Sequence, residues 1–396
     1  MPIAKSSLVT RAAKNFRMSN DFVSQKVFRQ KEQEKRILVL SKYARNGASS
    51  RLRVFQYLPL LEQRGFSFQL SSFFDKKYVD DLYAGRKTGL LRYLSYYWKR
   101  LSILSSIATG RKKFDIMWVE KEAFPYLPAL FERLIRASGI PYILDYDDAI
   151  FHNYDSHRLS VVRWLLGQKL DKLLQNSAAV MAGNKYLTDY AKLHNAPSVH
   201  FIPTVVDTTR YNASSKKPTD PVRIGWIGTP YTVRYLKSLL PTLGAASRKV
   251  NLKLVTIGAP PLDVPKGLEI EQHDWLEETE NRLLASIDIG IMPLPDEPFE
   301  RGKCGYKLIQ YMASGCAVIG SPVGVNSQIV TSDVGYLADT DDEWMHAIVA
   351  LASDSGKRYV MGEKGRQRIV EHYSLSSNVV KIEKILNEAI GGARGA

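Results

Sequence analysis

Three cations and two glycines lie close together around residue 305, where an apolar, helix-like run begins. Residues 299–315 read FERGKCGYKLIQYMASG, and the cations are Arg301, Lys303 and Lys307. Free backbone N–H groups at a helix start bind anions, and glycine lets a ligand approach the backbone closely. Lysine adds a point charge, whereas arginine offers a fork of donors that suits phosphate. The pattern predicts a diphosphate site; the alternative is a basic surface loop before an ordinary helix.

A second group of reactive side chains follows a predicted strand at 142–147. The stretch 142–157 reads YILDYDDAIFHNYDSH and brings together Asp145, Asp147 and Asp148. These carboxylates can bind a divalent cation through oxygen ligands. One of them can instead act as a base or orienting group for a reacting hydroxyl. In the third interpretation they cap the following turn.

Other polar and glycine-containing loops also follow predicted strands, and ligands of parallel sheets bind at the carboxyl ends of strands. The loops are NGASSRLR (46–53) and AGNKYL (182–187) in the first half, and IGWIGTP and QHDW in the second. Arg51 and Arg53 lie two positions apart and diverge on a helix, so at most one of them is expected to face the site. Trp275 of QHDW lies either beside a bound base or in the core.

The elements that position these loops are short apolar strands, which alternate along the chain with longer helical patterns. Strands are predicted at RILVLS, FSFQLSS, IMWVEK, YILDYD, AAVMAG and VHFIPT, and then at VRIGWIG, LKLVTIG, LEIEQ, IGIMPL, AVIGS and GYLA. Such alternation favours parallel sheets covered on both faces. Residues 202–221 are rich in Ser, Lys, Pro and Thr and separate the two series. The predicted fold class is α/β, with two doubly wound, Rossmann-like domains facing each other across a cleft.

The length and composition agree with this plan. A chain of 396 residues suits two domains. We expect a basic extension at 1–34, a first domain at 35–205, a second domain at 206–374, and a C-terminal helix at 375–396 that returns to the first. Two cysteines form no disulfide framework, and the sequence shows neither a signal peptide nor an apolar run of bilayer length. A cytoplasmic protein is therefore expected.

Positive charge is concentrated in two segments. Residues 1–36 hold nine basic and three acidic residues, and residues 82–114 hold eight basic and no acidic ones, so they contribute +6 and +8 of the formal +15. Within the second segment, a helix at 88–108 has leucines and aromatic residues on one face and cations on the other. Such a helix is typical of contact with an anionic membrane surface. The alternative is a helix packed on its own domain with a solvated basic face. No recognised nucleic-acid-binding module accompanies the charge, so nucleic acid is not an expected partner.

The segment KLIQYMASGCAVIGSPVGVN (307–326) resembles the donor-site signature of retaining, nucleotide-sugar-dependent glycosyltransferases of the GT-B fold (glycosyltransferase family four, group 1 type). IPTVVD, IGWIG, DIGIMPL and the closing HYS match that family in order, over residues 35–390. The resemblance implies transfer of a sugar from a nucleoside diphosphate to a glycan acceptor. It also implies that the diphosphate is neutralised without a metal ion or other resident cofactor.

The resemblance and the loops together assign three sets of site residues. The catalytic set comprises Lys307, Arg301 and Asp147. The donor-binding set comprises Gly228, Thr229, Trp275, Gly302, Lys303, Cys304, Gly305, Tyr306 and Gln310. The acceptor-side set comprises Gly47, Ser49, Ser50, Arg51, Asp145, Asp148 and Asn184. The backbone N–H groups of residues 302–306 and of the Gly228 loop are expected to face the donor phosphates.

The sequence departs from the family at two glutamates that the signature carries with seven residues between them. The second place holds Gln310, whose amide can still contact a ribose hydroxyl, and the first holds Gly302, which has no side chain. An acidic residue nearby can substitute, and the candidates are Asp296, Glu297 and Glu300. The donor sugar therefore stays open.

The expected function is transfer of a sugar, with retention of anomeric configuration, to a lipid-linked glycan at the inner face of a membrane, as in bacterial surface polysaccharide or lipopolysaccharide biosynthesis. Preorganised cations and N–H groups would stabilise the charge that grows on the departing phosphate. Three alternatives remain. The aspartates can form the D-x-D metal site of the GT-A fold. The protein can be a basic nucleic-acid- or membrane-binding protein with a non-catalytic sugar-nucleotide site. It can be an NAD-dependent oxidoreductase, although neither glycine loop carries the full dinucleotide fingerprint.

Overall fold

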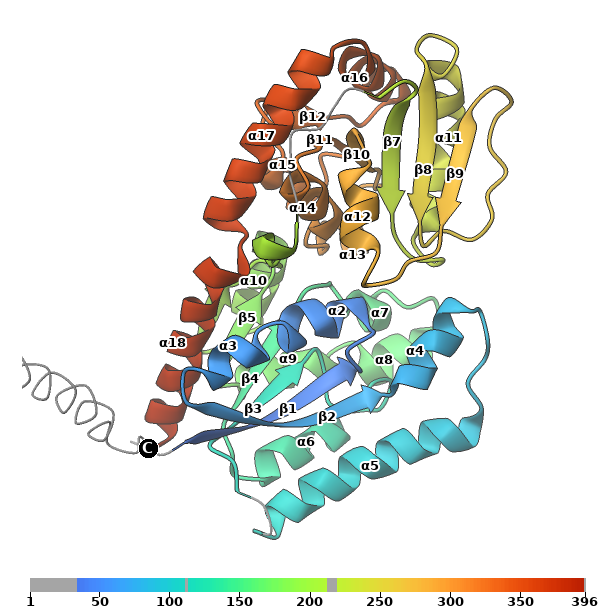
Figure 1. The fold of residues 1–396 in the computed structure, drawn as a ribbon. Coiled ribbons are helices and arrows are strands. Elements are labelled where there is room, and N and C mark those ends of the chain that lie inside the picture. Colours follow the sequence, from blue (N-terminus) through green and yellow to red (C-terminus); the bar gives the residue numbers. More distant parts are fainter. Residues whose placement is uncertain (1–33, 111–112, 212–218, 395–396) are drawn as a thin grey trace, which may run out of the picture.

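The computed structural model describes residues 34–110, 113–211 and 219–394, which form two parallel six-stranded sheets (Figure 1). The basic extension predicted at 1–34 lies, apart from its last residue, outside the described residues. The strand order of the first sheet is β2(Phe66–Phe74), β1(Lys35–Tyr43), β3(Ile116–Glu120), β4(Tyr142–Tyr146), β5(Ala179–Ala182), β6(Val199–Phe201). That of the second is β12(Gly335–Leu337), β11(Ala317–Gly320), β10(Ile289–Met292), β7(Val222–Ile227), β8(Leu252–Ile257), β9(Glu269–His273). All twelve predicted strands are present, and the two-domain α/β prediction is confirmed.

Helices connect the strands of the first domain. They are α2(Ala48–Ser50), a π-helical turn (Arg51–Phe55), α3(Leu58–Glu62), α4(Lys76–Tyr83), α5(Leu90–Ala108), α6(Ala129–Ala137), α7(His152–Asp155), α8(Ser160–Leu166), α9(Lys169–Gln175) and α10(Lys185–Leu193). Side-chain caps define where two of these helices begin. The Asp75 carboxylate caps α4 by accepting from the Tyr78 N–H, and the Asn184 side chain caps α10 by accepting from the Leu187 N–H.

Helices of the second domain follow a 3₁₀ turn at Thr208–Arg210. They are α11(Val233–Ala246), α12(Glu280–Ala285), α13(Pro298–Arg301), α14(Tyr306–Ala313), α15(Asn326–Ile329), α16(Asp341–Ser353), α17(Ser355–His372) and α18(Leu375–Arg394). A capping box of Thr340 and Glu343 starts α16. Figure 1 shows α17 along the second domain and α18 continuing beside the first.

The central strands carry continuous apolar runs because helices cover both faces of each sheet. Residues 37–40 of β1 and 116–119 of β3 are fully buried. The C-terminal helix α18 contributes Val379, Ile382 and Leu386 to the core that contains these strands. The chain end therefore ties the second domain to the first.

The helix α5 packs on its own domain and still presents apolar residues to solvent. Tyr96, Leu104 and Ile107 are buried, whereas Leu90, Leu91, Leu94 and Trp98 are 54–83% exposed. The sequence predicts an apolar face of Leu90, Leu94, Tyr97, Leu101, Leu104 and Ala108. Leu90 and Leu94 of that face are exposed, whereas Leu104 is buried, and the exposed stripe also includes Leu91 and Trp98, which lie outside that face.

Arg100 of α5 is not a surface cation, although the basic face was expected to include it. Its guanidinium is 1% exposed and donates to the carbonyl oxygens of Ser41, Ser71 and Ala123 at 3.0–3.3 Å. Burial lowers the Arg100 pKa to about 10. The residue joins α5 to the ends of β1 and β2 and belongs to the domain core.

Candidate active site between the two domains

Lys303 lies in the loop between α13 and α14 of the second domain, and Lys307 lies in the first turn of α14. Lys303 Nζ is 4.8 Å from the Phe299 ring centroid, and Lys307 Nζ is 5.7 Å from that of Trp226. Neither ammonium forms an ion pair or hydrogen bond with any described residue. Burial, with repulsion from Lys303, lowers the pKa of Lys307 to about 8. Two adjacent unneutralised cations of this kind favour an anionic ligand.

Backbone donors accompany these cations. Gly305 has φ +63° and precedes α14, and a Cβ at this position would meet the Ile329 side chain at 2.3 Å, so glycine is required. Within the described chain, the N–H groups of residues 304–307 have no acceptor, which leaves four donors at the start of α14. The N–H groups of Gly302 and Lys303 are used internally, by the carbonyls of Phe299 and Glu300. The free donors therefore begin at residue 304, not at 302 as expected.

Arg301 occupies a different environment from the two lysines. Its guanidinium is 47% exposed and forms two hydrogen bonds, of 2.7 and 3.0 Å, with the exposed Asp296 carboxylate. The structure does not bring Arg301 together with Lys303 and Lys307. Asp296 is one of the three acidic residues that could replace the family glutamate, and its carboxylate is engaged in this ion pair.

The facing wall belongs to the first domain and is built around Asp147, which follows β4. Asp147 Oδ1 lies 2.9 Å from Lys121 Nζ, and Asp147 Oδ2 lies 2.6 Å from Ser49 Oγ. Burial alone would raise the pKa of Asp147, but the Lys121 ammonium, the Ser49 hydrogen bond and the Arg53 charge together outweigh it, and the pKa is lowered. Lys121 is also 3.2 Å from Asp148, and the two carboxylates raise its pKa well above the ordinary value despite its burial. This is a charged aspartate held in one orientation.

Glu120 links the same wall to the start of α2. Its carboxylate accepts hydrogen bonds from Ser50 Oγ and from the Lys42 N–H, and lies 3.0 Å from Ser49 Oγ. Complete burial raises its pKa. The Ser49 hydroxyl thus stands between Glu120 and Asp147 and can donate to one of them at a time. Gly47 begins this turn, where a Cβ would meet Tyr43 at 2.4 Å.

Asp145 is a core residue and not part of the acceptor side. It is 1% exposed, and its carboxylate is 2.7 Å from Arg53 Nε and 3.3 Å from Trp118 Nε1. Burial raises its pKa to about 6, although Arg53 opposes this shift. The divergence predicted for Arg51 and Arg53 is confirmed, because Arg53 is buried in the first domain and Arg51 reaches the second.

Direct contacts join the two domains at the donor loop. Asn184 Nδ2 donates to the carbonyl oxygens of Gly302 at 2.7 Å and Lys303 at 3.0 Å, and Cys304 Sγ donates to the Asp147 carbonyl at 3.0 Å. A Cβ on Gly302 would meet Ala149 at 2.4 Å. Burial raises the Cys304 pKa to about 12, so its thiol stays protonated. Asn184 orients the two carbonyls toward the first domain.

A second interdomain contact involves Arg51 and Trp275. The Arg51 guanidinium lies 4.6 Å from the Trp275 ring centroid and 3.8 Å from Glu280, whose carboxylate accepts from the Trp275 indole N–H at 2.6 Å. Arg51 and Glu280 line a cavity of about 200 Å³ together with Tyr211 and Tyr306. Arg51 Nη1 is buried and has no partner among the described residues. Trp275 therefore faces the seam between the domains.

Three predicted donor residues have partners inside the protein. Gln310 is 2% exposed, and its amide donates to the Tyr211 hydroxyl at 3.4 Å. The Gly228 N–H donates to the Ile257 carbonyl at 3.0 Å, and the Thr229 N–H to Thr232 Oγ1 at 3.0 Å. The expectation that the amides of this loop face donor phosphates is therefore wrong, because the backbone and a side chain already use them.

The three predicted sets of site residues do not include Lys121, Glu280 and Tyr211, although the position of Lys121 after a strand predicts that it lines the same wall as the aspartates. Lys121 has a positive φ of 64°, rare outside glycine, and follows a predicted strand directly. Its position after IMWVE was the available signal. Glu280 and Tyr211 gave no comparable signal, because their contacts with each other and with Gln310 span 69 and 99 residues.

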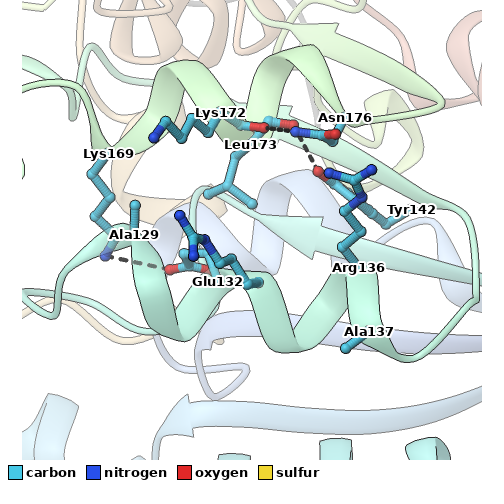
Figure 2. A pocket seen from close by; sticks show the side chains of 10 residues that line it. Ala129, Glu132, Arg136, Ala137, Tyr142, Lys169, Lys172, Leu173 and Asn176 are labelled. Carbon is cyan, nitrogen blue, oxygen red and sulfur yellow. Dashed lines mark hydrogen bonds and ion pairs between the residues drawn. The ribbon is translucent and has the colours of Figure 1, made fainter.

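A hollow of about 570 Å³ lies between α6 and α9 and is lined by none of the predicted site residues (Figure 2). Tyr142, the first residue of β4, lines it, so it adjoins the amino ends of the strands. The buried Lys169, which lines the hollow, forms ion pairs with Glu132 at 3.3 Å and Glu122 at 2.6 Å, so its positive charge is neutralised. The hollow is thus separate from the seam where the catalytic candidates meet.

No group of three or more potential metal ligands occurs in residues 34–110, 113–211 and 219–394. The three aspartates of the D-x-D interpretation are each paired with a cation instead, Asp145 with Arg53, and Asp147 and Asp148 with Lys121. Within the same ranges, no helix has both the length and the apolar character needed to cross a membrane.

Two facing parallel-sheet domains with a cation-rich loop at the carboxyl ends of the second sheet define the GT-B fold, and structural comparison confirms it. Residues 221–354, most of the second domain, match the family model described as glycosyl transferases group 1. No curated protein matches the chain.

Three solved structures illustrate the similarity. Sucrose-phosphate synthase from Thermosynechococcus elongatus superposes with a TM-score of 0.66 at 12% identity, covering 90% of this chain and 100% of that one. Anabaena Alr3699/HepE, in complex with UDP and glucose, gives a TM-score of 0.61 at 12% identity, with 89% and 99% covered. A glycosyltransferase from Rickettsia africae gives 0.62 at 14% identity, with 90% and 99% covered. The GT-A alternative is excluded by this fold.

Proposed function

We propose that this protein is a glycosyltransferase that moves a sugar from a nucleoside diphosphate, with UDP as the first nucleotide to test, to a glycan acceptor. The observation that carries the proposal is the pair of unneutralised lysines, Lys303 and Lys307, beside four free N–H groups at the start of α14. The group 1 match spans this loop, and a similar fold binds UDP and glucose in the Anabaena protein.

The residues of the second domain would act on the leaving group. As the sugar departs, negative charge grows on the diphosphate, and Lys303, Lys307 and the N–H groups of residues 304–307 stabilise that charge. They are held in place before the reaction, because Asn184 fixes the preceding carbonyls and Gly305 sets the turn. Arg301 is not assigned a direct role, since Asp296 holds it at the surface. In this proposal, turnover requires no metal ion.

The residues of the first domain would act on the acceptor. Asp147 is charged and oriented by Lys121 and Ser49, so it can accept a hydrogen bond from the attacking hydroxyl. We extend the family resemblance to stereochemistry and propose retention of the anomeric configuration. An NMR assignment of the anomeric proton in the product tests this point, and an inverted linkage would refute it.

We further propose that the acceptor is lipid-linked and that α5 contacts the membrane, as in surface polysaccharide assembly. The support is the stripe of Leu90, Leu91, Leu94 and Trp98, which is 54–83% exposed and lies beside the cations of residues 86, 87 and 99. Exposed apolar and aromatic side chains next to cations suit the interface of an anionic bilayer.

The experiment for the main proposal is incubation with a panel of UDP-sugars, measuring released UDP, in the presence and absence of excess EDTA. We expect one sugar to be turned over at equal rates in both conditions. A Lys237→Ala variant, which alters an exposed lysine of α11 in the same domain, serves as the matched control. Absence of UDP binding and of turnover with every sugar would refute the proposed function. Loss of activity in EDTA that manganese restores would refute metal-independent turnover.

A further inference from the structure

The hollow between α6 and α9 is lined by cations that the proposed reaction does not use. Its volume is about 570 Å³, and its lining includes Arg133 and Arg136 of α6 and Lys172 of α9. Figure 2 shows Arg136 and Lys172 on the two helices that face each other across the hollow. All three side chains are exposed, and none of them forms an ion pair or hydrogen bond with a described residue. Their charges are therefore available to a ligand.

The other polar groups of the lining already have partners. Among the described residues that line the hollow, Glu132 is the only acidic one, and it pairs with Lys169 at 3.3 Å and accepts from the Phe124 N–H at 3.0 Å. The Asn176 amide donates to the Lys172 carbonyl oxygen at 2.6 Å. Four cations and one carboxylate give the lining a formal charge of +3. A concave surface with charge of one sign attracts ligands of the opposite sign, so the hollow favours an anion.

Exposed apolar side chains accompany this charge on both helices. On α6, Leu130 is 63% exposed, and Leu134, one turn further along, is exposed as well. On the other side, α8 leads into α9 and carries Trp164, which is 84% exposed, and the exposed Leu165. No acidic residue occurs between 156 and 170. Cations with leucine and tryptophan beside them suit the interface of an anionic bilayer better than a water-soluble anion.

The hollow lies on the side of the first domain that α5 covers. Leu104 of α5, Ile135 of α6 and Leu173 of α9 belong to one core cluster. That cluster contains Leu38 of β1, whereas the neighbouring Ile37 points to the opposite face of the sheet, into the cluster of α3 and α18. The helices that form the hollow therefore cover the same face of the sheet as the helix proposed to contact the membrane.

We propose that the hollow between α6 and α9 binds the phosphate of an anionic phospholipid headgroup, with the exposed side chains of α6 and α8 beside the acyl chains. Arginine offers a fork of donors to phosphate oxygens, and lysine adds a point charge. This inference rests on the proposed membrane contact of α5 and adds a binding site for one class of lipid. Such a site holds the domain that carries Asp147 on the surface where a lipid-linked acceptor lies.

The test measures dissociation constants by ligand-observed NMR for dihexanoyl phosphatidylglycerol, dihexanoyl phosphatidylcholine and inorganic phosphate. Both lipids are kept monomeric, which excludes adsorption to a charged vesicle surface. Wild type should bind phosphatidylglycerol about tenfold or more tightly than phosphatidylcholine, the effect of one charge-assisted hydrogen bond. The triple variant Arg133→Gln, Arg136→Gln, Lys172→Gln should lose this preference. The control alters exposed lysines of the second domain, has the same net charge and should retain the preference: Lys237→Gln, Lys266→Gln, Lys364→Gln.

Three results of these titrations would overturn the proposal. The first is equal binding of the two lipids by wild type, or a preference that survives in the triple variant. The second is inorganic phosphate bound as tightly as phosphatidylglycerol, which would assign the hollow to a free phosphate. The third is binding of duplex DNA that the triple variant loses while its lipid preference is kept, which would assign the hollow to nucleic acid.

Sedimentation with phosphatidylglycerol vesicles separates this site from α5. Each cation near an anionic bilayer contributes about fivefold, so the partition coefficient of the triple variant should fall on the order of 10²-fold. Its melting temperature should equal that of wild type, because all three side chains are exposed.

The outcomes distinguish the two proposals. Wild-type partition of the triple variant, with loss of binding in Leu91→Glu, Trp98→Glu, would overturn the headgroup site and leave the membrane contact of α5 standing. Absence of vesicle binding by wild type would overturn both. Failure of UDP to bind would refute the glycosyltransferase function instead, and the lipid measurements would still decide the role of the hollow.

Discussion

Replacement of Lys307 by methionine tests the donor site most directly, because it keeps the apolar stem beside Trp226 and removes only the charge. No carboxylate of the described chain forms an ion pair with this ammonium. Burial and repulsion from Lys303 outweigh the attraction of Asp148 and lower its pKa, so its charge is available to a diphosphate. Removal of one such preorganised contact typically costs on the order of 10²-fold in turnover. We expect a loss of that size in kcat/KM for the UDP-sugar, and no loss in the Lys237→Met control.

The pH dependence sharpens this prediction. The pKa of Lys307 is about 8, below the ordinary value of a lysine, so the folded protein loses this charge as the pH rises through 8. A diphosphate favours the charged form, so the Kd for UDP should rise by about tenfold per pH unit above about 8. For folding the sign is opposite: the unfolded chain holds this proton more tightly, so the contribution of Lys307 to stability is lost as the pH falls through 8.

Calorimetric titration of UDP at several pH values, together with steady-state kinetics, checks both statements. Lys307→Arg keeps its charge throughout, so its Kd for UDP should stay flat over the range in which wild type weakens. Wild-type turnover in Lys307→Met, or an unchanged slope of Kd against pH in that variant, would show that this ammonium does not contact the diphosphate.

Three further predictions concern positioning, stability and the membrane. Asn184→Ser keeps the cap of α10 but loses the donor to the 302 and 303 carbonyls. The KM for the UDP-sugar should rise about tenfold, and the free energy of unfolding should fall by about 1–3 kcal/mol because buried carbonyls lose their partner; an unchanged KM would remove Asn184 from donor positioning. Asp145→Ala leaves the buried Arg53 without its carboxylate and should lower the free energy of unfolding, measured in urea, by about 3–5 kcal/mol. A variant that is fully stable but inactive would instead assign Asp145 to the acceptor site. The double variant Leu91→Glu, Trp98→Glu should no longer sediment with phosphatidylglycerol vesicles, whereas the control Tyr359→Glu on α17 should sediment as wild type does. Equal sedimentation of wild type, the double variant and the control would refute membrane contact by α5.

The sequence was sufficient to predict the strands, the alternation with helices and the two-domain plan. These depend on local patterns: apolar runs of strand length, helical periodicity and turn residues, which a reader can follow along the chain. The donor loop was also predictable, because its glycines, its lysines and the start of α14 are neighbours in the sequence. Lys303 and Gly305 lie in the loop before α14, and Lys307 lies in the first turn of that helix, as the sequence predicts.

Only the tertiary structure decided which charged groups remain available for a ligand. Arg301 and Lys307 look equivalent in the sequence, yet Asp296 pairs with the first and no described carboxylate pairs with the second. Asp145 and Asp147 are two residues apart, but partners 92 and 98 residues away, Arg53 and Ser49, place one in the core and the other at the seam. The local pattern sets where a side chain begins, whereas its charge is neutralised or left free by residues that the fold brings from elsewhere in the chain.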